Sequence, residues 1–172
     1  DISNWDVGSV EDMNYMFSGA TSFNQNINNW DVSNVKSMDY MFSNVTSIGI
    51  VAFVGTLEYT RADSTAFNQP VGNWNVSNVV NMGGMFSGAT SFNQDISGWD
   101  VCSLSSVKGM FYGASSFNSP IGKWKFKPIT NMENMFREAT AFNQDISSWD
   151  VSNVTEMKGL FQDASSFNQN IR

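Results

Sequence analysis

Three lysines alternate with two aromatic residues in the stretch GKWKFKP, residues 122–128. Basic side chains interleaved with aromatic ones are typical of grooves that bind nucleic acids or other polyanions, because cations pair with phosphates and rings stack on bases. The candidate cationic residues are Lys123, Lys125 and Lys127. The chain as a whole has 16 acidic and 9 basic residues and a net charge of −7, so a polyanion site must be local.

Carboxylates offer a second chemistry, because aspartate recurs directly after most of the tryptophans. Glycoside hydrolysis requires two carboxyl groups about 5 to 9.5 Å apart. The candidate pairs are Asp6 with Asp31 and Asp100 with Asp150. Lys125 lies between the second pair in the repeat order, where it would keep both carboxylates ionised and leave no general acid. We therefore do not expect catalysis.

The composition excludes several other site classes. The chain has no histidine and one cysteine, so Cys/His metal sites, disulfides within the chain and nucleophile–histidine pairs are excluded, and no cofactor is expected. Cys102 is interpreted as a substitute for serine. The longest apolar run, residues 48–54, is far shorter than the roughly 20 residues of a membrane-spanning helix. No signal peptide begins the sequence, and the chain is not expected to span a membrane.

The residues that must position these groups belong to an internal repeat. Successive tryptophans are 25, 44, 25, 25 and 25 residues apart, and the phrase FNQ or FNS follows the same period. Such a period predicts an array in which each unit packs only against its neighbours. We divide a single domain, residues 1–172, into modules 1–25, 26–69, 70–94, 95–119, 120–144 and 145–169, with 19 extra residues within 43–66.

The apolar spacing changes within each module. Trp30 and Val32 are two residues apart, which predicts a short strand, whereas spacings of three and four from Val35 to Phe42 predict a short helix. The expected fold is an α/β repeat solenoid similar to leucine-rich repeats. Short parallel strands would form its concave face and short helices its other side.

Residues at the ends of the predicted helices agree with this interpretation. Asn34 and Asn153 are expected N-caps, and Glu156 completes a pattern that resembles a capping box. The second residue after the phenylalanine of M-x-x-M-F is expected to have a left-handed backbone conformation, as at a helix end. It holds Gly19, Asn44, Gly88, Gly113, Glu138 and Asp163.

The repeated apolar positions are expected to form the core. All ten methionines lie in M-x-x-M positions, and two of these positions hold Val107 and Leu160 instead, which argues for packing and against a Cu(I) site. Trp124 and Phe126 occupy inward positions, so the rings of GKWKFKP are expected to be buried. The asparagine that follows phenylalanine in every module is expected to form a ladder that satisfies turn groups. Its members are Asn24, Asn68, Asn93, Asn118, Asn143 and Asn168.

The positions between the inward Trp and Val are expected to face outward, because strand side chains alternate. Lys125 is expected to pair with Asp100 and Asp150. Lys123 and Lys127 project from the same module and are interpreted as a contact point for an acidic partner. The candidate ligand-binding residues are Asp6, Asp31, Asn75, Asp100, Lys123, Lys125, Lys127 and Asp150.

The repeat WDVSNV…M..MFSGATSFNQDIS resembles the 25-residue repeat of BspA-like leucine-rich-repeat surface proteins. This resemblance covers nearly the whole chain and fails in the insertion. It implies the fold described above and a setting at the cell surface or outside the cell. Members of that family are mostly adhesion or binding proteins, so the resemblance implies no catalytic residues.

The leading expectation is a non-catalytic recognition or adhesion module that binds protein or glycan through its concave face. The alternatives are a passive spacer in a longer surface array and a polysaccharide-acting enzyme. Nucleic acid is not an expected partner, because the acidic positions would repel phosphates. Ile2 and Ile171 would expose stacking surfaces, so the chain is expected to stack on further repeats of a longer parent chain.

The insertion within 43–66 departs from the repeat. It is interpreted either as a binding loop or as an incidental insertion, for which a retained intron is one source, since 19 codons preserve the reading frame. Asn44 and Asn153 begin NVT sequons, which would carry glycans only in a host that modifies them.

Overall fold

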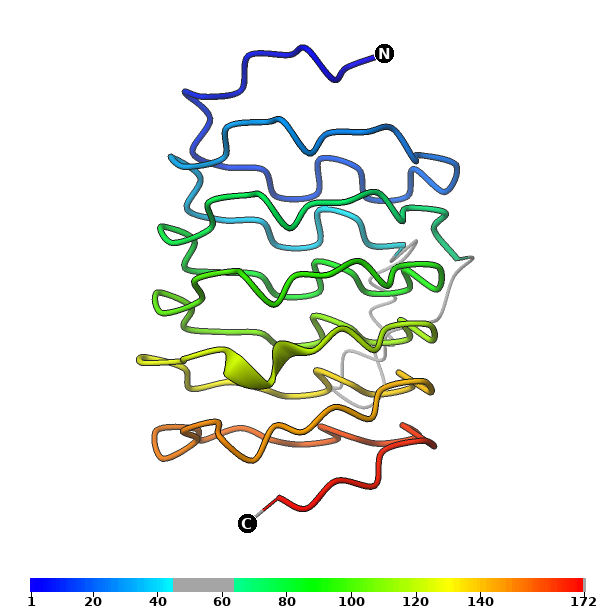
Figure 1. The fold of residues 1–172 in the computed structure, drawn as a ribbon, viewed down its shortest axis with the longest axis vertical. Coiled ribbons are helices and arrows are strands. Elements are labelled where there is room, and N and C mark those ends of the chain that lie inside the picture. Colours follow the sequence, from blue (N-terminus) through cyan, green and yellow to red (C-terminus); the bar gives the residue numbers. More distant parts are fainter. Residues whose placement is uncertain (45–63, 172) are drawn as a thin grey trace, which may run out of the picture.

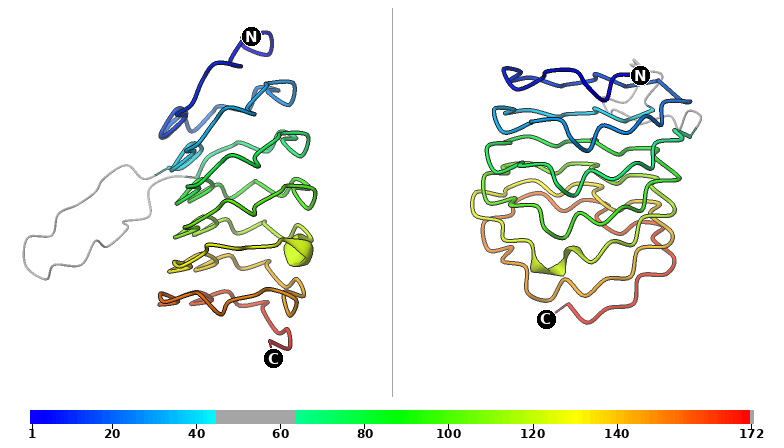
Figure 2. Two further views of the ribbon diagram at one scale, coloured as in Figure 1. Left: turned by 90° about the vertical axis from the view of Figure 1, so that its left-hand side faces the viewer. Right: turned by 45° about the horizontal axis from the view of Figure 1, so that its top comes forward.

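The chain forms a stack of similar circuits that follow one another from the N-terminal to the C-terminal end (Figures 1 and 2). This computed structural model describes residues 1–44 and 64–171, so most of the insertion lies outside the described residues. We call each circuit a layer. The described residues contain one regular element, the 3-10 helix η1 at Ile121–Lys123. Isolated parallel bridges join neighbouring layers, and their residues are Asp12, Ser37, Asn81, Ser106, Asn131 and Glu156.

The predicted α/β solenoid is wrong. Residues 1–44 and 64–171 contain no α-helix and no strand, and the predicted division into a strand face and a helix face is therefore wrong as well. In the expected helix, Met13 N donates to Ser37 O at 3.0 Å in the next layer, whereas Met16 N donates to Met13 O at 3.3 Å within its own layer. An α-helix would keep both bonds within the segment, four residues apart. Bonds to the next layer and tight turns thus alternate along this segment.

The backbone conformation also excludes a helix at these positions. Tyr15, Tyr40 and Asn134 have φ of +58°, +56° and +55° in the middle of the expected helix. Side chains other than glycine rarely adopt this left-handed region, and a right-handed helix cannot contain it. The left-handed conformation expected at the later position is confirmed at five of the six residues, all except Asn44, but it forms a turn rather than a helix end. It occurs at Gly19, Gly88, Gly113, Glu138 and Asp163.

The predicted N-caps have a different task. Asn34 Nδ2 donates to Gly8 O at 2.6 Å, and Asn153 Nδ2 donates to Lys127 O at 3.4 Å. Both acceptors lie in the preceding layer, so these amides join layers and cap no helix. Glu156 is likewise a bridge residue and not part of a capping box.

Aromatic columns fill the interior, which confirms the predicted core. Phe86 stacks on Phe92 of its own layer at 3.9 Å between ring centroids and on Phe111 of the next layer at 5.7 Å. Each buried tryptophan also holds the preceding layer through its indole. Trp99 Nε1, for example, donates to Val71 O at 3.0 Å. The same bond is made by Trp30, Trp74, Trp124 and Trp149.

The predicted asparagine ladder is confirmed. Asn118 N donates to Asn93 Oδ1 at 2.8 Å, and Asn118 Oδ1 in turn accepts from Asn143 N at 3.0 Å. Gln144 Nε2 donates to the same oxygen at 2.9 Å. Each amide oxygen thus satisfies the turn of the layer that follows it.

We expect Asn118→Ala to lower the free energy of unfolding by about 1–3 kcal/mol, because it leaves the Asn143 amide without its acceptor and removes one of the two acceptors of Gln144 Nε2. Urea denaturation monitored by tryptophan fluorescence measures the change. Asn168→Ala is the matched control, because Asn168 Oδ1 accepts no hydrogen bond from the described residues. An equal loss in both variants would contradict a ladder.

A second ladder contains a partly buried carboxylate. Asn14 Oδ1 accepts from Asp39 N at 2.7 Å, and Asp39 Oδ1 accepts from Gly83 N at 2.6 Å. Burial raises the pKa of Asp39 above its ordinary value of 3.8, the bond from Gly83 opposes this, and the nearby Asp12 charge raises the pKa further. The fold therefore favours the protonated form of this side chain.

We expect Asp39→Asn to stabilise the protein. The new amide oxygen can accept the hydrogen bond from Gly83 N, as the amide oxygen of Asn14 accepts one from Asp39 N, and it carries no charge into the partly buried position. At pH values below the unfolded-state pKa, the raised pKa of Asp39 in the folded state does not change the free energy of unfolding. As the pH rises through the folded-state pKa, ionisation of Asp39 lowers the free energy of unfolding. The gain should therefore be absent near pH 3, full at pH 7 and at most about 1 kcal/mol, given the partial exposure. Thermal unfolding at both pH values measures it, with the exposed Asp6→Asn as control.

Candidate recognition surface

The predicted ligand-binding residues all lie on the surface. Asp6, Asp31, Asn75, Asp100, Lys125 and Asp150 occupy equivalent exposed positions of successive layers, and we call them the acidic column. Lys123 and Lys127 are exposed on either side of Lys125. The rings of Trp124 and Phe126 are buried, with Phe126 edge-on between Trp124 and Trp149. The aromatic half of GKWKFKP therefore belongs to the core, as predicted, and cannot stack on a ligand.

The aspartates of the acidic column have a structural task that the sequence analysis missed. Asp31 Oδ1 accepts from Ser33 N at 3.0 Å, and Asp100 Oδ1 accepts from Cys102 N at 3.0 Å. Such Asx turns hold the backbone where no strand ladder exists. Asn75 accepts from Ser77 N at 3.2 Å in the same way. The sequence patterns D-x-[SGC] and N-x-S, which recur after the tryptophans, could have identified these Asx turns.

These bonds keep the carboxylates ionised. The backbone and side-chain hydrogen bonds of Cys102 lower the pKa of Asp100, and the charge of Lys127 lowers it further. The side-chain and backbone bonds of Ser152 lower the pKa of Asp150. A general acid needs a raised pKa, so the pair Asp100 and Asp150 is poorly suited to glycoside hydrolysis.

The ion pairs predicted for Lys125 are wrong. Among residues 1–44 and 64–171, Lys125 forms no ion pair with Asp100 or Asp150. The two carboxylates are instead directed to the amides of their own turns. It is Lys127, and not Lys125, whose charge acts on Asp100. Lys123, Lys125 and Lys127 thus present three ammonium groups without an ionic partner in the described part of the chain.

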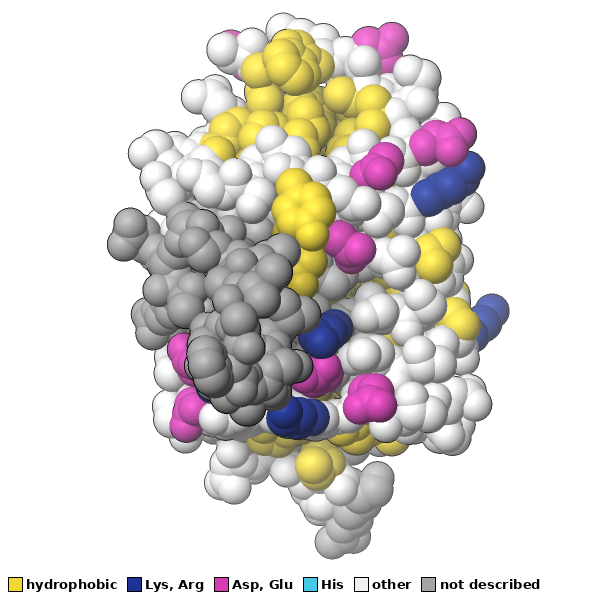
Figure 3. Space-filling model, turned by 180° about the vertical axis from the view of Figure 1, so that it is seen from behind, with side chains coloured by type: hydrophobic (Ala, Val, Ile, Leu, Met, Phe, Trp, Pro, Cys, Tyr) yellow, Lys and Arg dark blue, Asp and Glu magenta, His cyan; other side chains and the backbone are white. Residues whose placement is uncertain are grey.

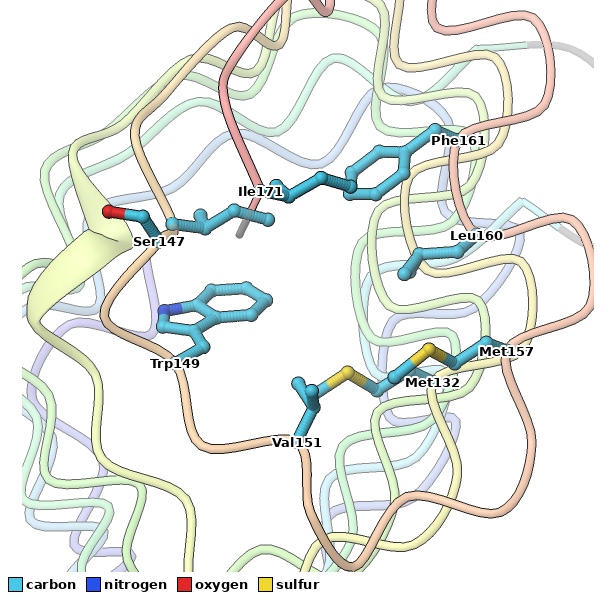
Figure 4. A pocket seen from close by; sticks show the side chains of 9 residues that line it. Met132, Ser147, Trp149, Val151, Met157, Leu160, Phe161 and Ile171 are labelled. Carbon is cyan, nitrogen blue, oxygen red and sulfur yellow. The ribbon is translucent and has the colours of Figure 1, made fainter.

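A pocket of about 210 Å³ opens at the C-terminal end of the stack, and the sequence analysis did not identify it. The side chains of Trp149, Val151, Leu160, Phe161 and Ile171 border a common space (Figure 4). Trp149, Val151, Leu160 and Phe161 occupy repeated apolar positions of the last layer, and Ile171 holds the position equivalent to Ile146 one repeat later.

Hydrophobic side chains also gather at the opposite end, where the chain begins, while acidic and basic groups are interspersed along the face below (Figure 3). Trp5, Tyr15 and Met16 are exposed there. No three His, Cys, Asp or Glu side chains form a metal-binding group among the described residues. The part of the chain that the structure describes also contains no helix long enough to cross a bilayer.

We expect Asp100→Ala to lower the free energy of unfolding by about 0.5–1.5 kcal/mol at pH 7, because Cys102 N loses its acceptor. Asp100→Asn is the matched control, since Asn75 shows that an amide makes the same turn. The lowered pKa of Asp100 stabilises the fold above the unfolded pKa, and this contribution is lost as the pH falls through the folded pKa. The wild-type protein should therefore lose more stability than Asp100→Asn on acidification below about pH 4. Identical pH profiles would refute the assignment.

Comparisons with known proteins identify one family. The model of the family described as "Mycoplasma protein of unknown function, DUF285" matches residues 1–53, 51–140 and 119–172. No curated protein and no solved structure matches the chain. The family match confirms a repeat family, although not the BspA-like leucine-rich-repeat proteins specifically. Since the three matches together extend over the entire sequence, the chain belongs to the DUF285 family.

Proposed function

We propose that the chain is a non-catalytic recognition or adhesion module at the cell surface or outside the cell. It binds an acidic protein segment or an anionic glycan through Lys123, Lys125 and Lys127. The resemblance of the repeat to BspA-like surface proteins supports the location and the general role. Ionised carboxylates held in turns support a role without catalysis.

One observation carries the proposal. In the other layers the acidic-column residue is Asp or Asn and closes an Asx turn, so its identity follows from the fold. Lys125 cannot accept this bond, and the fold gains nothing evident from a lysine there. Lys123 and Lys127 are exposed with it and form no ion pair within the described residues. Three unpaired cations that the scaffold does not require favour a binding task.

A passive spacer in a longer surface array is the second candidate. It is favoured by the apolar surface on both end layers, which is what the interior of a longer stack would contain. In that case the three lysines would bind nothing.

The test is binding to arrays of anionic and neutral glycans and to acidic peptides, with the variant Lys123→Ala/Lys125→Ala/Lys127→Ala. Three exposed ion pairs of about 0.5 kcal/mol each predict a loss of roughly tenfold in affinity for anionic ligands. The charge-matched control is Lys36→Ala/Lys108→Ala/Lys158→Ala, whose circular dichroism must match the wild type. This surface would be excluded if both variants lost affinity equally, or if ligands bound the Lys123→Ala/Lys125→Ala/Lys127→Ala variant as tightly as the wild type. Absence of any ligand would favour the spacer.

A further inference from the structure

The Asx turn that follows the tryptophan is closed in every layer except the fifth. In the other five layers, an Asp or Asn side-chain oxygen accepts from the backbone amide two residues later at 3.0 to 3.2 Å. In the fifth layer Lys125 stands at the acceptor position and has no oxygen to offer. The equivalent donor, Lys127 N, forms no hydrogen bond with the described residues. One surface amide is therefore unpaired where the other layers place a carboxylate or amide oxygen.

A neighbouring acceptor is unpaired as well. In the other layers, the residue that follows this turn donates from its side chain to a carbonyl of the preceding layer, as in Asn34, Asn78, Ser103 and Asn153. The fifth layer holds Pro128 there, which has no side-chain donor. Cys102 O, the corresponding carbonyl, accepts no hydrogen bond within the described part of the chain. The fifth layer thus leaves both a donor and an acceptor for another molecule.

Three ammonium groups lie along the same stretch. Lys123, Lys125 and Lys127 alternate with Trp124 and Phe126, whose side chains are only 1% and 5% exposed. Because successive side chains of an extended backbone point to opposite sides, the lysines project to one side, about 6.5–7 Å apart. We call these three residues the lysine row. It runs along one layer, across the axis of the stack.

The backbone beneath the lysine row is held in place by the core. The row begins at the end of η1, the coiled ribbon in Figure 1. Phe126 lies edge-on between Trp124 and Trp149, with ring centroids 6.1 and 5.1 Å away. Lys127 O accepts from Asn153 Nδ2 of the next layer at 3.4 Å. A ligand therefore meets a backbone that is already ordered, which lowers the entropic cost of binding.

The layers on either side determine the direction in which an anionic ligand can lie. Asp100 and Asp150 hold the positions equivalent to Lys125, one layer or about 4.8 Å to each side. A polyanion that followed the stack axis would be repelled by both carboxylates. An anionic chain that follows the lysine row meets three cations in single file. The surface therefore favours a narrow ligand whose charges lie in one line.

We propose that the lysine row binds an extended acidic peptide segment with carboxylates at alternate residues, one of which accepts from Lys127 N. This inference rests on the proposed function and specifies its ligand. An extended peptide projects every second side chain to one side, so its carboxylates have the same spacing of about 6.5–7 Å as the lysines. The ligand carboxylate at Lys127 N takes the role that Asp100 has at Cys102 N. Peptide N–H groups also supply a donor for Cys102 O.

Two seven-residue peptides of the same composition test the spacing. Thr-Glu-Thr-Glu-Thr-Glu-Thr presents three carboxylates on one side of an extended chain, whereas Thr-Thr-Glu-Glu-Glu-Thr-Thr presents two. The alternating peptide should bind about two- to fivefold more tightly, as one further exposed ion pair predicts. High salt should reduce this preference. NMR titration of the 15N-labelled chain measures both affinities, and the Lys127 amide should be among the resonances that shift most.

Two variants separate the amide from the ammonium group. Lys125→Ala and Lys125→Asn both remove one cation, but only the asparagine supplies an oxygen that can close the turn, as Asn75 does. Lys125→Asn should therefore have the higher urea midpoint of the two. It should also bind the alternating peptide about two- to tenfold more weakly than Lys125→Ala, because its own side chain occupies Lys127 N. Lys158→Ala is the control for charge and should bind like the wild type.

The proposal is overturned if neither peptide binds, if both bind equally, or if Lys125→Ala and Lys125→Asn have equal affinities. A heparin tetrasaccharide then separates this failure from that of the proposed function. If it binds the wild type and loses affinity in Lys123→Ala/Lys125→Ala/Lys127→Ala, the proposed function stands with a glycan as ligand. If the affinity of no anionic ligand depends on the three lysines, the proposed function fails as well.

Discussion

Hydrogen bonding between consecutive layers is the constraint on which the whole structure depends. Buried backbone groups need partners, and in this protein neither helices nor sheets supply them within the described residues. Each layer instead uses its neighbours: alternate amides donate to the next layer, the indoles of five tryptophans donate to the preceding layer, and the ladder asparagines from Asn24 to Asn143 accept from the turn that follows. The phenylalanine columns then fill the space that these bonds enclose. A single layer therefore satisfies only part of its polar groups, those of its turns, without a neighbour.

This constraint separates structural from functional polar residues. Asp31 and Asp100 are exposed and charged, which in isolation suggests a binding site, yet each closes a turn that the layer requires. The three lysines of the fifth module close no turn and pair with no carboxylate among the described residues. Equivalent positions of the other modules show which residue the fold requires. A residue that differs from them without a structural reason is the better candidate for function. The proposed function therefore rests on the three lysines.

The same constraint gives the stack a direction. Met13 N and Phe17 N donate to the following layer, whereas Lys36 N and the indole of Trp30 donate to the preceding one. Because all the bridges are parallel, each layer repeats this pattern of donors and acceptors toward its neighbours.

Residue type and position within one repeat were sufficient to predict the period, the buried methionine and phenylalanine positions, and the burial of Trp124 and Phe126. They were also sufficient to predict the asparagine ladder and the exposure of the acidic column. The packing of one layer on the next decided that M-x-x-M-F is no helix, that Asn34 bonds to Gly8, and that the carboxylates close turns instead of pairing with Lys125. Spacing of three and four residues fits a helix and a chain of turns equally well. The choice depends on amide partners 24 to 44 residues away, such as Ser37 O for Met13 N, which exist only once the layers have stacked.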